Sequence, residues 1–186
     1  MKLTRDWLFI HVPRTGGRSI SEAIGENPIA PNHYTLSDWI NNLGEEVVTK
    51  KFVFSTVRNP WERAVSWYSF FTPKQEFQTP FQFNQWVLQR NQYPLWPKGL
   101  TSLDHMSFYK DTQGNDYPLD YYLRFEHLQE DFAALNKQLH FPNPLGNIGT
   151  NDTLASNYKN YYTTKEAVDY IASLNQQLIT KFNYTF

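Results

Sequence analysis

Residues 52–68 read FVFSTVRNPWERAVSWY and place an apolar strand directly before a helix. The run FVFSTV has the length and apolar character of a buried strand. Asn59 can cap the helix that follows and Pro60 suits its first turn, so we predict a helix over residues 60–71. Arg58 lies at the corner between the two elements, where its guanidinium can meet either a carboxylate or the phosphate of a ligand.

Two further apolar runs are followed by helical patterns in the same way. WLFIHV at 7–12 precedes the loop PRTGGRS and a helix, and LDYYLRF at 119–125 precedes a helical pattern over 130–141. Strands that alternate with helices are typical of the α/β class. We therefore predict a single domain over residues 1–186 with a central parallel β-sheet flanked by helices, and we expect ligands at the carboxyl ends of its strands. Further helices are predicted over residues 35–43, 80–91 and 163–182, the last of them continuous and amphipathic.

The composition limits the class of protein. The 186 residues have a net charge of -1, which gives no global reason to expect nucleic acid as a partner. The absence of cysteine excludes disulfides and cysteine-based zinc sites, and it agrees with a reducing compartment. The apolar run near the start is too short to span a membrane. We expect a cytoplasmic protein that binds neither nucleic acid nor membrane.

The loop PRTGGRS, residues 13–19, has the features of an anion-binding loop. Gly16 and Gly17 allow the backbone to approach a ligand closely, and the helix that begins here directs N–H groups toward the loop. Arginine and hydroxyl side chains in the same loop add charge and hydrogen-bond donors. The GxxxxGK[ST] spacing of a phosphate-binding P-loop is absent, so an ordinary glycine-containing turn between a strand and a helix stays an alternative.

The corner after the second predicted strand is another candidate anion site. Arg58 leaves the strand end and Ser66 lies two helical turns beyond Asn59, so both side chains can face one pocket. Alternatively, Arg58 pairs with Glu62 and Ser66 has no part in binding. Two anion-binding corners at neighbouring strand ends would suit a ligand with phosphates at both ends. No aspartate follows the second strand to hold magnesium, which favours metal-free transfer of a group with less charge than phosphoryl, such as sulfuryl.

Five segments together resemble the sulfotransferases that use 3'-phosphoadenosine 5'-phosphosulfate (PAPS), most of all the carbohydrate-type branch that includes the heparan sulfate and chondroitin sulfotransferases. They are, in the family's order, FIHVPRTGGRS, NHYTLSDW, FVFSTVRNPWERAVSWY, LRFEHLQEDF, and YYTTKEAVDYI with KFNY. The first and third correspond to the family's two cofactor motifs. The resemblance implies the sulfotransferase form of the P-loop nucleotide-hydrolase fold. It also implies PAPS as co-substrate and 3'-phosphoadenosine 5'-phosphate (PAP) as product.

The resemblance assigns residues to the two ends of the cofactor, and it implies no metal site. The first loop would hold the 5'-phosphosulfate through Arg14, Thr15, Gly16, Gly17, Arg18 and Ser19. The 3'-phosphate would be held by Arg58 and Ser66. The family usually has lysine at the position of Arg14. An arginine can stabilise the transferring group but is a poor proton donor, so a proton-donating role at this position is open.

His33 matches the position at which some branches of the family carry the catalytic base. A histidine can take a proton from an acceptor hydroxyl near neutral pH. A solvent-exposed histidine at a helix entry is the alternative, and other branches use glutamate. His11, on the first strand, is a reserve candidate, although a histidine inside a strand is more often a hydrogen-bonded core residue.

The segment over residues 72–118 matches nothing well in the family and is expected to face the acceptor. Its aromatic side chains could line a sugar or phenol site or could pack between helices: Phe77, Phe81, Phe83, Trp86, Tyr93 and Trp96. Near the last helix, Tyr158 and Lys159 could reach the nucleotide. Glu126 is expected to have a structural role with Arg124 in a buried polar network.

The predicted function is transfer of a sulfuryl group from PAPS to a hydroxyl of a carbohydrate or small-metabolite acceptor. Two alternatives stay open: an atypical P-loop kinase that depends on magnesium, and a non-catalytic module that binds a nucleotide or a sulfated glycan. By analogy with the family, the small size favours a bacterial or viral protein. The sequence specifies neither the acceptor nor the oligomeric state.

Overall fold

The computed structural model describes residues 6–26, 33–71, 79–89, 103–146 and 157–186. The chain divides into two compact units, and each unit combines two stretches of sequence. The first unit is Met1–Val57 with Met106–Gly149, and the second is Arg58–His105 with Thr150–Phe186. The prediction of a single domain over residues 1–186 stays a prediction.

The first unit contains a parallel sheet of three strands in the order β1-β2-β3. The strands are β1 (Trp7–Ile10), β2 (Phe52–Val57) and β3 (Tyr121–Arg124). Phe9 lies opposite Phe54, and Phe54 lies opposite Tyr121, in parallel register. The predicted α/β class and the parallel sheet are therefore confirmed, with β1 and β3 shorter than their apolar runs.

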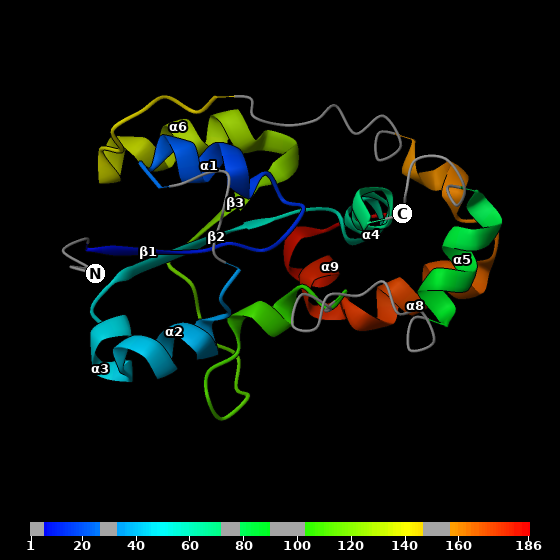
Figure 1. Cartoon of the computed structure of the whole chain (residues 1–186), viewed down its shortest axis with the longest axis horizontal. Coiled ribbons are helices and arrows are strands. Elements are labelled where there is room, and N and C mark those ends of the chain that lie inside the picture. The colour runs from blue at the N-terminus through cyan, green and yellow to red at the C-terminus, as the bar shows by residue number, and fades with distance from the viewer. Residues whose placement is uncertain (1–5, 27–32, 72–78, 90–102, 147–156) are drawn as a thin grey trace. The chain divides into compact units, whose positions relative to one another are not determined.

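One face of the sheet is covered by α1 (Gly17–Ala23) and α6 (Leu128–Leu139), which lie on the same side of the strands in Figure 1. Phe9, Phe54 and Leu123, one from each strand, form a buried hydrophobic cluster with residues of both helices. The prediction placed the second of these helices over 130–141. It begins earlier because the chain passes from β3 through the short 3-10 helix η3 (Phe125–His127) directly into α6.

The opposite face is covered by α2 (Leu36–Leu43) and α3 (Glu45–Val48), seen on the other side of the strands in Figure 1, and by the 3-10 helix η2 (Met106–Tyr109). Leu8 and Val53 join these helices in a second buried cluster. Because successive strand side chains point to opposite faces, one short run of apolar residues supplies both clusters. The expectation of helices on both faces is confirmed.

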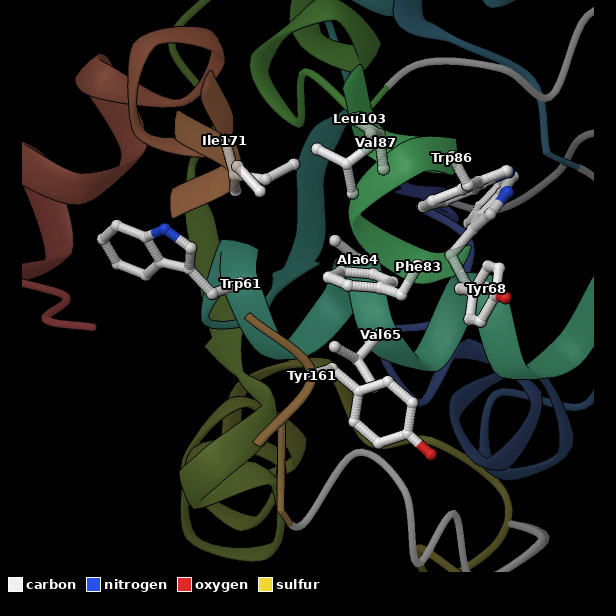
Figure 2. Packing of buried hydrophobic residues seen from close by; sticks show 12 residues of the cluster. Trp61, Ala64, Val65, Tyr68, Phe83, Trp86, Val87, Leu103, Tyr161 and Ile171 are labelled. Carbon is white, nitrogen blue, oxygen red and sulfur yellow. The ribbon is translucent and has the colours of Figure 1, made fainter. Parts of the chain in front are cut away.

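The second unit is organised around α4 (Pro60–Phe71), which has the predicted bounds. It packs with α5 (Pro80–Leu88), with α8 (Lys165–Leu174) and with the 3-10 helix η4 (Tyr158–Tyr161). Figure 2 shows the aromatic and aliphatic side chains that form its core. They include Trp61, Ala64, Val65, Tyr68, Phe83, Trp86, Val87, Leu103, Tyr161 and Ile171.

Asn59 caps α4 as the sequence predicts. Its side-chain oxygen accepts hydrogen bonds from the backbone N–H groups of Trp61 and Glu62, at 3.1 and 3.3 Å. Its side-chain amide donates to the backbone oxygen of Thr185 at 3.0 Å. The start of α4 is thus fixed both locally and by the C-terminal segment of the same unit.

The prediction of one continuous helix over residues 163–182 is wrong. The chain breaks at Asn175 into α8 and a second helix, α9 (Gln176–Phe182). The Asn175 side chain is buried, its amide donates to the backbone oxygen of Leu103 at 3.1 Å, and its oxygen accepts from the backbone N–H of His105 at 3.0 Å. These bonds satisfy backbone groups of Leu103 and His105 and hold Asn175 outside the helical conformation. None of the helices in the described residues has the length and apolar character needed to cross a bilayer.

Candidate functional site

The loop after β1 has an unusual backbone. Arg14 has a φ of 66° and Gly16 a φ of 83°, while Thr15 between them has an ordinary negative φ. Alternation of this kind turns backbone N–H groups toward a common concavity, as in anion-binding nests. Glycine adopts a positive φ freely, but for arginine it costs roughly 1–3 kcal/mol, and such strain concentrates at functional positions.

The side chain of Thr15 anchors the loop from below. It is fully buried and donates its hydroxyl proton to the backbone oxygen of Val12 at 2.7 Å. It also pairs with the hydroxyl of Thr56, which must be the donor because the Thr15 proton is already used. The Thr15 hydroxyl proton is therefore used inside the protein in this structure. Cofactor contact by Thr15 stays a prediction.

A second hydroxyl bridge joins β2 directly to β1. Ser55 donates to the backbone oxygen of Ile10 at 2.6 Å, and the Tyr109 hydroxyl lies 3.0 Å from the Ser55 oxygen and 3.2 Å from the backbone oxygen of Thr56. The side chains of Ser55, Thr56 and Tyr109 are all buried. Ser55, Thr56 and Tyr109 were not predicted from the sequence. The adjacent hydroxyl residues Ser55 and Thr56, in an otherwise apolar strand, could have indicated this bridge.

Gly17 lies directly against the ring of His11. A Cβ at Gly17 would be 1.9 Å from Nε2 of His11 and 2.0 Å from its Cδ2, so only glycine fits here. The His11 ring is buried, stacks on Phe9 with 5.5 Å between ring centroids, and lies 4.3 Å from the ring of His33. Burial first, and then the nearby positive charges of His33 and Arg18, lower the pKa of His11 from 6.5 to about 3. His11 is therefore a poor base near neutral pH.

His33 makes a hydrogen bond that fixes its tautomer. Its Nδ1 lies 3.2 Å from the backbone oxygen of His11. A carbonyl oxygen can only accept, so Nδ1 carries the proton and Nε2 of neutral His33 keeps its lone pair. The ring is half-buried rather than fully exposed. Of the two predicted candidates for the base, the geometry favours His33 over His11.

The remaining loop residues differ in exposure. Arg14 is half-buried, Arg18 is exposed, and Ser19 is buried at the first turn of α1. Gly16 accepts hydrogen bonds through its backbone oxygen from the N–H groups of Ser19 and Ile20, at 3.1 and 3.4 Å. The first unit thus brings two arginines, the start of a helix and a histidine with a defined lone pair together around one loop.

Arg58 and Ser66 belong to the second unit. Arg58 is buried just before α4 and forms an ion pair at 2.8 Å with Glu62 in the first turn of that helix. This pair is the alternative that the sequence left open for Arg58. The ion pair is made through one terminal nitrogen of the guanidinium, and a phosphate role for Arg58 stays a prediction. Ser66 is fully buried on α4.

Arg124 is the last residue of β3, and it does not belong to the expected buried network. It binds the carboxylate of Asp131 through two side-chain bonds of 2.9 and 2.7 Å, and its backbone N–H donates to the same carboxylate at 2.8 Å. Arg124 and Glu126 are both exposed. The expectation of burial is therefore wrong, because Arg124 is held by the first turn of α6 at the surface.

The predicted acceptor segment is described only in part. Phe83 and Trp86 are buried in the core of the second unit, which matches the packing alternative, whereas Phe81 is 68% exposed. Phe77, Tyr93 and Trp96 lie outside the described residues. Lys159 lies over the ring of Phe186 at 5.6 Å, and the ring of Tyr158 is 5.9 Å from that of Phe186. A nucleotide contact for these two stays a prediction.

Metal ligands do not cluster in the part of the chain that the structure describes, where no three His, Cys, Asp or Glu residues group around a common point. Comparisons of the chain with protein-family models, with curated proteins and with solved structures found no match. The function is therefore inferred from the motifs and from the geometry around the loop.

Proposed function

We propose that the protein is a sulfotransferase that moves a sulfuryl group from PAPS to a hydroxyl of a carbohydrate or small-metabolite acceptor. The sequence motifs suggest this activity, and the arrangement after β1 supports it. The observation that carries the proposal is the hydrogen bond from Nδ1 of His33 to the backbone oxygen of His11, at 3.2 Å. It assigns the proton of neutral His33 to Nδ1, so Nε2 is the basic nitrogen. The His33 ring lies 4.3 Å from the ring of His11, which packs against Gly17, so a candidate proton acceptor lies close to the candidate anion loop.

In the proposed reaction, Nε2 of His33 takes the proton of the acceptor hydroxyl while the hydroxyl oxygen attacks sulfur in line. An S–O bond forms to the acceptor, the S–O bond to the 5'-phosphate breaks, and PAP leaves with the electron pair. Arg14 and the loop amides stabilise the negative charge on the transferring group and on the leaving phosphate. The products are a sulfate ester, PAP and a proton on His33 that passes to solvent.

The proposed fold is the sulfotransferase form of the P-loop nucleotide-hydrolase fold, and the proposed residue roles follow the two motifs. Arg14, Arg18 and Ser19, with the backbone of Gly16 and Gly17, would bind the 5'-phosphosulfate. Thr15 would support this loop through its buried hydroxyl. Arg58 and Ser66 would bind the 3'-phosphate, with Glu62 orienting the guanidinium by its 2.8 Å ion pair.

Calorimetry with PAP tests the nucleotide assignment. We expect micromolar binding by the wild-type protein, and we expect Arg58→Ala to abolish it because a buried bidentate phosphate partner is lost. Lys50→Ala is the matched control, since it also removes a cation but from an exposed pair with Glu46. If PAP does not bind at millimolar concentration, the proposal is wrong.

Turnover of PAPS with a panel of hydroxyl acceptors tests the chemistry. His33→Ala is expected to lower kcat by roughly 10²–10⁴-fold, the usual contribution of a general base. His127→Ala is the control, because His127 is about half exposed and pairs with the exposed carboxylate of Glu130. PAP binding without turnover on any acceptor would favour the non-catalytic module, and activity that chelation of magnesium abolishes would favour the kinase.

A further inference from the structure

His11 combines two features that its packing alone does not explain. Its side chain is almost fully buried just after β1, and its Nε2 and Cδ2 atoms lie against the second glycine of the loop. Among the described residues, its Nδ1 finds no hydrogen-bond partner. A buried polar atom without a partner costs free energy, so such a group calls for an explanation.

The charge state of the ring is settled by its surroundings. Burial first, and then the charges that His33 and Arg18 can carry, lower the pKa of His11 to about 3, so the ring is neutral near neutral pH. A neutral imidazole carries one N–H and one bare nitrogen. His11 is therefore neither a cation nor a useful base, and its remaining capacity is to donate one hydrogen bond.

The position of the single proton follows from burial. Buried N–H groups without an acceptor are rarer in proteins than buried acceptors without a donor. The partnerless Nδ1 of His11 is thus the bare nitrogen, and the proton lies on Nε2, at the edge that contacts Gly17. A neutral histidine whose N–H points at developing negative charge can polarise a substrate without transferring a proton.

We propose that His11 donates a hydrogen bond from Nε2 to an anionic oxygen at the 5' end of the bound nucleotide. This inference rests on the proposed function, in which the loop holds that end. The donor is uncharged, so it adds to the charges of Arg14 and Arg18 without increasing the repulsion between them. It also provides a directed N–H beside a position where this chain has arginine and the family usually has lysine.

The binding test uses three nucleotides and two variants. His11→Phe keeps the ring and its stacking on Phe9 but removes the donor, whereas His11→Gln keeps an amide N–H. His11→Phe is expected to weaken binding of PAP and of 5'-AMP by about 10- to 100-fold, the usual loss for a hydrogen bond to a charged group. Binding of 3'-AMP, which lacks the 5'-phosphate, is expected to be unchanged, and His11→Gln is expected to recover part of the loss.

Each outcome separates this inference from the proposed function. Equal affinity of wild type and His11→Phe for PAP would overturn the role of His11 and leave the sulfotransferase proposal intact. Failure of the wild type to bind PAP would overturn the proposed function itself. If His11→Phe does not fold, nitrogen NMR of the histidine-labelled wild-type protein decides the matter, because the proposal requires the Nε2–H tautomer and the Nδ1–H tautomer contradicts it.

Discussion

Replacing Gly17 by alanine is the sharpest test of the packing beneath the loop. The new Cβ would lie 1.9, 2.0 and 2.7 Å from Nε2, Cδ2 and Cε1 of His11, all closer than atoms in proteins approach. Gly17 has no positive φ, so the backbone itself tolerates alanine. The effect therefore comes from the overlap with the His11 ring, which cannot easily move because it is buried between Phe9 and His33.

The magnitude follows from two opposed terms. Alanine in place of glycine in a helix gains about 0.5–1 kcal/mol, whereas overpacking in a filled core typically costs about 1–3 kcal/mol. Three overlaps with a ring that is held in place correspond to the upper end of that range. We expect Gly17→Ala to lower the free energy of unfolding by about 2 kcal/mol, measured by urea denaturation followed by circular dichroism.

Two comparisons make this result specific. Gly146→Ala is the control, because its Cβ would meet only the flexible carboxylate of Glu22 at 3.2 Å, and we expect a change within about 0.5 kcal/mol. In a His11→Ala background the overlap is absent, so Gly17→Ala is expected to be neutral or to stabilise by up to about 1 kcal/mol. A Gly17→Ala protein as stable as wild type, or a loss of the same size in both backgrounds, would refute the reasoning.

Other changes give separate expectations. Arg14→Gly relieves the positive φ of 66° and is expected to raise the free energy of unfolding by about 1 kcal/mol while weakening PAP binding, a split that denaturation and calorimetry detect together. Asn175→Ala leaves the backbone N–H of His105 without its side-chain acceptor and is expected to cost about 2–3 kcal/mol in urea denaturation. Partial burial raises the pKa of the Asp131 carboxyl. Hydrogen bonds from Arg124 lower this pKa by more than burial raises it, so the pKa lies below the ordinary value of 3.8. The stabilisation from Asp131 is therefore fully present above about pH 4 and is lost as pH falls through the lowered pKa, and Asp131→Asn is expected to flatten the acid limb of the stability profile. An acid limb that is equally steep in wild type and Asp131→Asn would contradict this assignment.

The elements that the sequence predicted correctly are those with short-range signals. The bounds of α4 follow from Asn59 and Pro60 together with the apolar run behind them, and the three strands follow from compact apolar segments. The break at Asn175 could not be predicted, because its amide binds a loop 72 residues away in the chain. An amphipathic pattern continues across that break, so the local sequence alone favours one helix.

The candidate site divides in the same way. The glycine loop is visible in the sequence because residue type and order suffice to mark it, whereas His33 is selected by its position in the family resemblance. The buried hydroxyl of Thr15 pairs with that of Thr56, 41 residues away on β2, and the tautomer of His33 depends on a backbone oxygen 22 residues away. For Arg58 the sequence suggested two partners, a ligand phosphate or Glu62, and the structure contains the ion pair with Glu62.

The interleaving of the two units in the chain has a consequence for synthesis on the ribosome. The first unit is complete once residue 149 has emerged, but the second unit begins at Arg58 and needs α8, which lies beyond it. Until α8 is made, the apolar face of α4 that includes Trp61 and Ala64 lacks part of its cover. Exposed apolar surface of this kind invites aggregation or chaperone binding. We therefore expect a nascent chain to be prone to aggregation if translation pauses after residue 149 and before α8 has been made.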